Sequence, residues 1–120
     1  MTRNQTVEIN HLTVLQIQYL TELEQLEKGR GTIGAVAAKC GVKHPTVSRF
    51  FKSCIEKGYL TESLEFTDKG KKMLRWHQKV QKDVREYLER SGITEGIDDV
   101  LKGMIENIDY RRLEELTKSH

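Results

Sequence analysis

The residues best suited to chemistry in this chain form a heptad at positions 43–49. It combines positive charge with short hydroxyl groups, through Lys43, His44, Thr46, Ser48 and Arg49. Pro45 suits the first turn of a helix, because the N–H that it lacks would have no helical partner there. The free N–H groups and partial positive charge of a helix start also attract phosphate. This combination is typical of a helix whose N-terminal end meets DNA.

Within this segment, long side chains would read bases, while short ones and the backbone would set the register on phosphates. Arg49 is the candidate for guanine, and Lys52 is a candidate for a base or a phosphate. The preceding helix would cross the DNA backbone, where Thr32 and Lys39 could touch phosphates. The predicted DNA-binding residues are therefore Thr32, Lys39, Lys43, His44, Pro45, Thr46, Ser48, Arg49 and Lys52. The alternative is a capped helix start with a solvated charged face.

Charge is distributed unevenly along the 120 residues, although the formal net charge is only +2. Residues 39–57 hold five basic residues and one acidic residue, a local net charge of +4. Residues 91–120 hold four basic and seven acidic residues, a local net charge of −3. Because DNA binding depends on clustered charge, we expect one surface for DNA and another for a different contact. The basic run from Lys69 to Lys82 is interpreted as a solvated helix face, with phosphate contacts from Lys69–Lys72 as the alternative.

Apolar spacing predicts the helices that would position these residues. Residues 12–26 carry apolar side chains at spacings of three and four, which indicates an amphipathic helix. A short helix over 33–40 follows, with Thr32 as its N-cap and Gly41 as its stop, and the next helix runs from Pro45 to about residue 57. Two helices joined by a short, glycine-bearing turn form the helix-turn-helix pattern.

A wing is predicted directly after the second helix of this motif, because residues 58–67 read as two brief strands joined by a tight turn. Its polar tip has no Lys or Arg, so we expect it to add little to DNA affinity. Thr67 or Asp68 then caps a long helix that ends near Arg90. Two further amphipathic helices are expected, over about 97–108 and 110–116.

These elements predict a mainly α fold in two parts. Residues 1–70 would form a winged helix-turn-helix DNA-binding domain with a short two-stranded wing, and residues 71–120 a helical dimerisation region. No stretch reaches the ~18–20 apolar residues needed to cross a bilayer, and the polar N-terminus lacks a signal-peptide core. We therefore expect a soluble, cytoplasmic protein without membrane contact.

Catalysis has little support in the sequence, and we predict that the protein is not an enzyme. There is no glycine-rich phosphate loop or nucleophile elbow. Cys40 and Cys54 are isolated and are interpreted as small buried hydrophobes, with a redox-sensing pair as the alternative. His77 stands one helical turn from Gln81, and we interpret it as a core histidine rather than a metal ligand.

The chain resembles the metal-responsive repressors of the diphtheria toxin repressor and manganese transport regulator family over about residues 12–116. The matching pieces are Val36-Ala37-Ala38, Pro45-Thr46-Val47-Ser48, Gly58-Tyr59-Leu60 and Thr67-Asp68-Lys69-Gly70-Lys71-Lys72. A Thr-x-x-Gly after a wing also occurs in other winged-helix families. The resemblance implies a homodimeric transcriptional regulator whose helices after the wing form the dimer and effector region.

The metal-ligand positions of that family are altered in this chain. The ligand histidine of the family falls at Gln81 and its neighbouring glutamate at Arg85, and the other positions fall at Asp99, Gly103, Glu106 and Asn107. An arginine would repel a divalent cation, and the loss of imidazoles removes most affinity for transition metals. We therefore expect no cofactor. The alternative is a rearranged manganese or iron site that uses His77, Gln81, Asp99 or Glu106.

The prediction for function is a sequence-specific regulator of transcription, a repressor, that binds double-stranded DNA. It would act as a homodimer on a pseudo-palindromic operator. The alternatives are a winged-helix module that binds another protein, and a metal sensor with a rearranged site.

Overall fold

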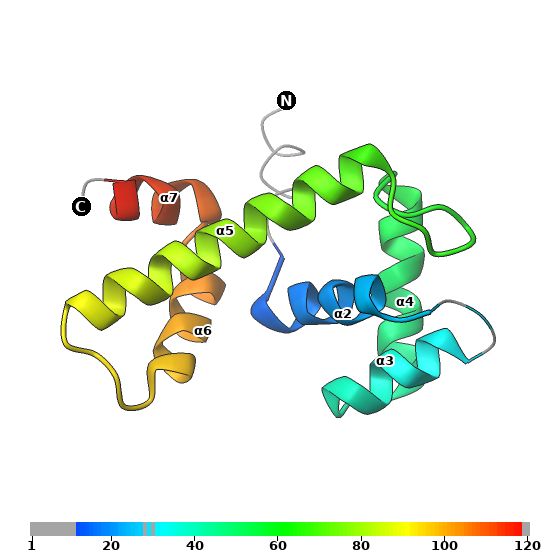
Figure 1. Ribbon diagram of the computed structural model, residues 1–120, viewed down its shortest axis with the longest axis horizontal. Coiled ribbons are helices and arrows are strands. Elements are labelled where there is room, and N and C mark those ends of the chain that lie inside the picture. The colour runs from blue at the N-terminus through cyan, green and yellow to red at the C-terminus, as the bar shows by residue number, and fades with distance from the viewer. Residues whose placement is uncertain (1–11, 28, 30, 119–120) are drawn as a thin grey trace. The chain divides into compact units, whose positions relative to one another are not determined.

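The computed structural model describes residues 12–27, 29 and 31–118, which contain six helices (Figure 1). These are α2 (Val14–Gln25), α3 (Thr32–Cys40), α4 (His44–Glu56), α5 (Asp68–Arg90), α6 (Ile97–Asn107) and α7 (Tyr110–Lys118). From the sequence alone a loose arm is expected at residues 1–10, which lie outside the described residues. No helix within the described ranges is long and apolar enough to span a membrane.

The described residues form two compact units. One unit is Leu15–Arg75, and the other starts at Trp76 and also contains residues 12–14. The division falls inside α5, after Arg75, because the first two turns of this helix bond to the first unit. Arg75 pairs with Glu24 of α2, and Lys69 donates to the backbone of Lys57.

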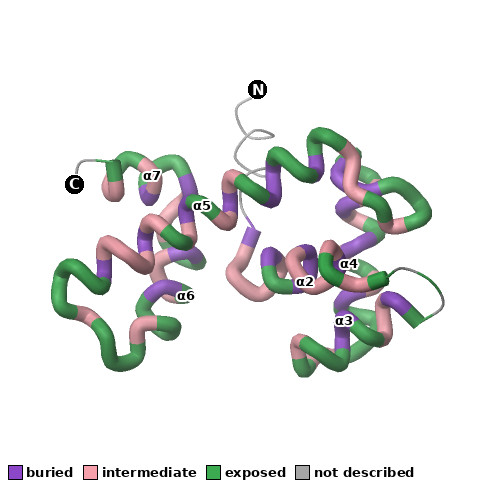
Figure 2. Tube along the Cα trace, in the orientation of Figure 1, coloured by how far each residue is buried: buried purple, intermediate pink, exposed green. Residues whose placement is uncertain are grey.

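The helices of the first unit each have a buried and an exposed side (Figure 2). On α4 the buried side consists of Val47, Phe51 and Cys54, whereas Ile55, which the sequence also predicts on this face, is half-buried. The other buried residues of this unit come mainly from α2, α3 and the start of α5, and include Ile17, Leu20, Leu23, Val36, Ala37, Met73 and Leu74. Taking this apolar surface out of water stabilises the unit by roughly 25 cal/mol for each Å².

Gly41 ends α3 and directs the chain into α4, as predicted. Its φ of 68° is left-handed, a conformation that strains residues with a Cβ atom. The N–H groups of Gly41 and Val42 donate to the carbonyls of Ala38 and Ala37 at 3.3 and 3.0 Å. These two bonds form a Schellman motif, which closes the helix and starts the turn.

The predicted N-cap of α3 at Thr32 is wrong, because Gly31 occupies the cap position and has no side chain to bond with. Thr32 is the first helical residue. Its hydroxyl donates to the carbonyl of Gly29 at 2.6 Å and accepts the N–H of Gly29 at 2.9 Å. The hydroxyl therefore ties the helix to the preceding loop instead of capping the free N–H groups of the first turn.

The segment after α4 has no regular strand among the described residues, so the two strands of the predicted wing do not appear there. A single antiparallel bridge joins Leu60 and Phe66. Between these two residues, Thr61 donates its N–H to the carbonyl of Glu65 at 2.8 Å. The side-chain Oγ1 of Thr61 accepts the N–H of Glu65 at 3.1 Å. The strand pairing stops after one bridge for two reasons. The tight turn occupies the residues between Leu60 and Phe66, and α5 begins at Asp68, two residues after Phe66.

Thr67 is the cap of α5, as the sequence predicted. Its hydroxyl accepts the N–H of Gly70 at 3.0 Å and donates to the carbonyl of Gly58 at 2.6 Å. Gly70 lies so close to the preceding loop that an added Cβ atom would be 2.0 Å from the carbonyl oxygen of Tyr59. The Thr-x-x-Gly sequence therefore joins the end of α4 to the start of α5 by direct backbone contact.

The second unit packs α5, α6 and α7 around one apolar cluster, composed of Val80, Val84, Leu88, Leu101, Ile105, Tyr110 and Leu113. His77 is 0% exposed, and its ring lies 4.9 and 4.4 Å from the ring centroids of Trp76 and Tyr110. The prediction of a core histidine is therefore confirmed. The apolar stripe that the sequence predicts on α6 includes Val100, Leu101 and Ile105, of which Leu101 and Ile105 are buried and Val100 is 37% exposed.

Candidate nucleic-acid interface

The helix-turn-helix motif consists of α3 and α4, which pack against each other across the turn at residues 41–43. Lys43 is extended, with φ −86° and ψ 150°, and is the cap residue of α4. Pro45 lies in the first turn, where its missing N–H costs no hydrogen bond. Thr46 donates its N–H to the carbonyl of Lys43 at 3.1 Å. The start of α4 thus has the geometry that the heptad predicted.

One side of α4 faces solvent and carries most of the predicted DNA-binding residues. Exposed positions are Lys43, His44, Pro45, Thr46, Arg49 and Lys52, and Ser48 is half-buried. The opposite side is the buried one described above. Since side chains three or four positions apart share a face, Arg49 and Lys52 extend the exposed surface that begins at Pro45. This side of α4 is called the reading side below.

The charges of the reading side are not neutralised by the rest of the fold. Among the described residues, Lys43, Arg49 and Lys52 form no ion pair. Glu56 is the first carboxylate after them along the chain. Three exposed cations without a local partner produce a positive potential that attracts phosphate, with a strength that depends on salt.

The two candidates on α3 differ in what they can offer to DNA. Thr32 is 7% exposed and its hydroxyl is fully engaged with Gly29. The side chain of Lys39 is 63% exposed, with Nζ 4.0 Å from Oε1 of Glu22. Such an exposed, long ion pair contributes little, so Lys39 can exchange it for a phosphate. The structure thus favours Lys39 over Thr32 as a side-chain contact.

Two positions that sequence reasoning did not single out support the reading side. The ring of Phe50 contacts Tyr19 of α2 edge to face, with centroids 5.8 Å apart. An added Cβ atom at Gly34 of α3 would lie 3.9 Å from Cδ2 of His44, so the two helices approach closely at the start of α4. Two features of the sequence could have pointed to these positions. Phe50 lies next to the core residue Phe51, and Gly34 lies inside a predicted helix, where glycine often allows close packing.

The candidate metal ligands lie in the second unit and do not form a cluster. His77 is enclosed by aromatic rings, and Nε2 of Gln81 donates to the hydroxyl of Tyr110 at 3.0 Å. Asp99 and Glu106 are exposed on α6. Within the described ranges, no three or more His, Cys, Asp or Glu side chains are grouped so that they could hold a metal ion.

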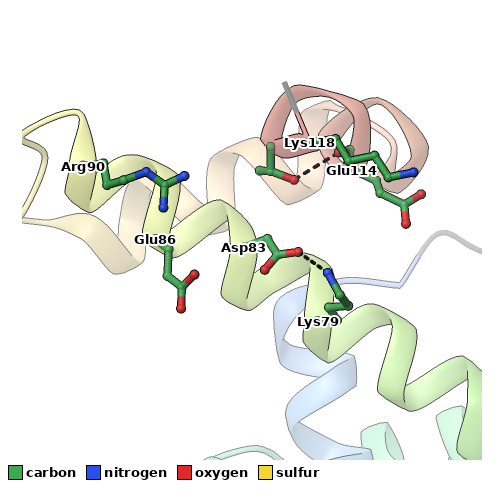
Figure 3. A pocket seen from close by; sticks show the side chains of 7 residues that line it. Lys79, Asp83, Glu86, Arg90, Glu114 and Lys118 are labelled. Atoms are coloured by element: carbon green, nitrogen blue, oxygen red, sulfur yellow. Dashed lines mark hydrogen bonds and ion pairs between the residues drawn. The ribbon is translucent and has the colours of Figure 1, made fainter. Parts of the chain in front are cut away.

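A polar pocket of about 230 Å³ lies between α5 and α7 in the second unit (Figure 3). Three basic and three acidic side chains line it, namely Lys79, Asp83, Glu86, Arg90, Glu114 and Lys118, together with Thr117. Lys79 pairs with Asp83 at 2.6 Å. With its charges balanced in number, this pocket lacks the positive potential of the reading side.

Comparison with known proteins places most of these elements in one family. A family model described as wHTH-PRTase associated matches residues 9–94, more than half of the chain. No curated protein and no solved structure matches the sequence. The match supports the winged helix-turn-helix type that the sequence predicted. It names a family other than the diphtheria toxin repressor family.

Proposed function

The chain belongs to the wHTH-PRTase associated family, and from this premise we propose that it binds double-stranded DNA and regulates transcription. The observation that carries the proposal is the reading side of α4, with Lys43, Arg49 and Lys52 exposed and without ion pairs among the described residues. A helix of 13 residues, about 20 Å long, fits the major groove when its N-terminal part enters first.

In this proposal the residues of the motif have separate roles. Arg49 reads a guanine through its two parallel N–H groups, and Lys52 contacts a base or the neighbouring phosphate. Lys43 and Lys39 bind phosphates on either side of the groove, while Thr46 and Ser48 donate hydroxyl hydrogen bonds that set the register. The proposed protein acts in the cytoplasm and is not an enzyme. Its binding to DNA requires no metal ion. Equal affinity with EDTA and with added manganese, iron(II) or zinc would support this.

We further propose a homodimer that recognises a pseudo-palindromic operator and represses transcription. One recognition helix contacts only a few base pairs, so two copies supply the specificity that a regulator needs. The helices of the second unit are the proposed dimerisation region. Val100 of α6 is a large apolar residue that is 37% exposed there. Repression would result because a bound dimer blocks access to a promoter.

The first test replaces the proposed base-reading residue. We expect Arg49→Ala to weaken binding to a DNA fragment selected from genomic DNA by about 1–3 kcal/mol and to relax the preference at one position. Fluorescence anisotropy at fixed salt concentration measures the affinity, and a set of fragments with each base at that position measures the base preference. Arg111→Ala, which removes an exposed arginine on α7, serves as the matched control. Equal affinities of the wild type and Arg49→Ala would refute the role of Arg49.

A second candidate function, a protein-interaction module, is supported by the description of the family, which associates the domain with PRTase, the usual abbreviation of phosphoribosyltransferase. The salt dependence of duplex binding separates the two candidates. Binding that neutralises several phosphates gives a slope of about −0.9 for each in log K against log salt. Absence of this dependence, together with co-purification of a phosphoribosyltransferase, would favour the interaction module.

A further inference from the structure

We propose a second DNA contact outside the reading side, formed by three lysines where α4 ends and α5 begins. These junction lysines, Lys57, Lys69 and Lys72, would bind backbone phosphates beside the groove that α4 enters. The inference rests on the proposed function, because it concerns the same DNA duplex. For the start of the basic run it chooses phosphate contacts, which the sequence offered only as the alternative to a solvated face.

A hydrogen bond joins two of the junction lysines, Lys69 and Lys57. Nζ of Lys69 donates to the backbone carbonyl of Lys57 at 2.8 Å and lies 5.3 Å from the ring centroid of Tyr59. The start of α5 therefore lies beside the end of α4 (Figure 1). Lys72 is three positions after Lys69 and shares its side of the helix.

Their charges are available to a ligand. All three side chains are exposed, and Lys69 bonds to a neutral carbonyl and an aromatic ring, which leave its charge uncompensated. Among the described residues, Lys57 and Lys72 have no ion pair. Asp68 precedes Lys72 by one helical turn, yet the two form no ion pair either.

Folding accounts for two of these cations, because Lys57 lies at the C-terminal end of α4, where partial negative charge favours a cation, and Lys69 bonds to a carbonyl at that end. The first turn of a helix carries partial positive charge, which disfavours a lysine there, and the effect falls off beyond that turn. Lys69 lies in the first turn of α5 and Lys72 in the second. Three cations in one place also repel each other. A bound anion would neutralise this repulsion, which favours a ligand as the reason for a further exposed cation, Lys72, beside the other two.

The length of α4 identifies that anion as the DNA backbone. Its 13 residues span about 20 Å, whereas the major groove is about 12 Å wide. When the N-terminal part of α4 lies in the groove, its C-terminal end reaches the edge, where phosphates line the duplex. Lys57 is the residue that follows this end, and Lys69 and Lys72 lie beside it.

The same helix offers a control. Lys71 is exposed and equally close to the helix start, but it lies about 100° around the helix from Lys72. It therefore points away from the junction lysines. Replacing Lys71 or Lys72 by glutamine removes the same charge from the same turn, so only the side of α5 differs between the two variants.

The test measures the slope of log Kd against log salt for the full chain on its selected DNA fragment and on an unrelated duplex. We expect Lys72→Gln to lower the magnitude of the slope by about 0.9 and Lys57→Gln/Lys72→Gln by about twice that, equally on both duplexes. Lys71→Gln should keep the wild-type slope. Thermal unfolding midpoints of Lys71→Gln and Lys72→Gln should equal or exceed that of the wild type.

Other outcomes overturn the inference. An unchanged slope for the double variant, while Arg49→Ala still weakens binding, refutes the second contact and leaves the proposed function intact. Equal losses for Lys71→Gln and Lys72→Gln refute its assignment to one side of α5. A lower unfolding midpoint with an unchanged slope assigns the lysines to folding. Absence of salt-dependent DNA binding by the wild type refutes both proposals together.

Discussion

Adjacent residues of α4 serve different purposes because each step along a helix turns the side chain by about 100°. Phe51 is buried, whereas Lys52 beside it is exposed. Cys54 is buried again, two positions later. Substitutions on this helix should therefore divide into those that change the stability of the fold and those that change DNA binding, with little overlap.

Cys54 provides a prediction for pH dependence. Burial raises the pKa of its thiol to about 12 from the usual 9, against a weaker opposing effect of Lys57. Between these values the native state keeps a proton that the unfolded state has lost. The stability that this thiol contributes is therefore complete below pH 9 and is lost as the pH rises toward 12.

The measurement compares two variants that both lack the other cysteine. We expect Cys40→Ser to lose stability above pH 9 more steeply than Cys40→Ser/Cys54→Ala, as measured by urea unfolding at successive pH values. Comparing slopes removes the constant cost of the cavity that alanine leaves. The same slope for both variants would contradict the raised pKa.

At the scale of elements, the start of α5 depends on one close backbone approach. We expect Gly70→Ala to destabilise the fold by about 3 kcal/mol, because the added Cβ atom would lie 2.0 Å from the carbonyl oxygen of Tyr59. Denaturant unfolding followed by circular dichroism measures the change. The backbone of the loop would have to move, and with it the hydrogen bonds of Thr67.

Gly103 in α6 is the control for this prediction. An added Cβ atom there meets nothing within 4 Å, and the residue has an ordinary helical backbone. Alanine should therefore stabilise α6 by about 0.5–1 kcal/mol. A destabilisation of similar size at both positions would show that the contact with Tyr59 is not the cause.

Helices were more predictable than the loop after α4, and the reason is physical. Each helix is specified by its own apolar spacing and by local ends such as Gly41 and Thr67. A strand forms only when a partner strand is present and when enough residues lie between the turn and the next helix. The loop between Leu60 and Phe66 is too short to meet the second condition. The tight turn was predictable from the residue types, but the number of paired residues on either side of it was not.

At the scale of the whole molecule, the proposed dimer makes a geometric prediction. Two recognition helices related by symmetry should contact half-sites about 34 Å, or one turn of DNA, apart. We expect an insertion of 5 base pairs between the half-sites to reduce affinity to that of a single half-site. Substituting the same central base pairs without insertion is the control.

Sedimentation measures the stoichiometry in the same experiment. Two chains should bind one intact operator, and dimers should form without DNA at micromolar concentrations. One chain on an intact operator, with no effect of the insertion, would contradict the dimer. The DNA-binding role of Arg49 would then stand on its own.

The distribution of charge also belongs to the whole molecule. Residues 39–57, which contain α4, have a net charge of +4, and residues 91–120 have a net charge of −3. Phosphates attract the first segment and repel the second. The acidic segment is therefore free for other contacts, such as those of the proposed dimer.

The sequence by itself determined the order and approximate extent of the helices, the helix-turn-helix type and which residues of α4 face solvent. These follow from periodicity, glycine and capping, which act over a few residues. Only the tertiary structure decided that the hydroxyl of Thr32 is occupied, that aromatic rings enclose His77, and that Lys57 and Lys69 meet. Such contacts depend on which surfaces pack together, and spacing along a single chain does not contain that information.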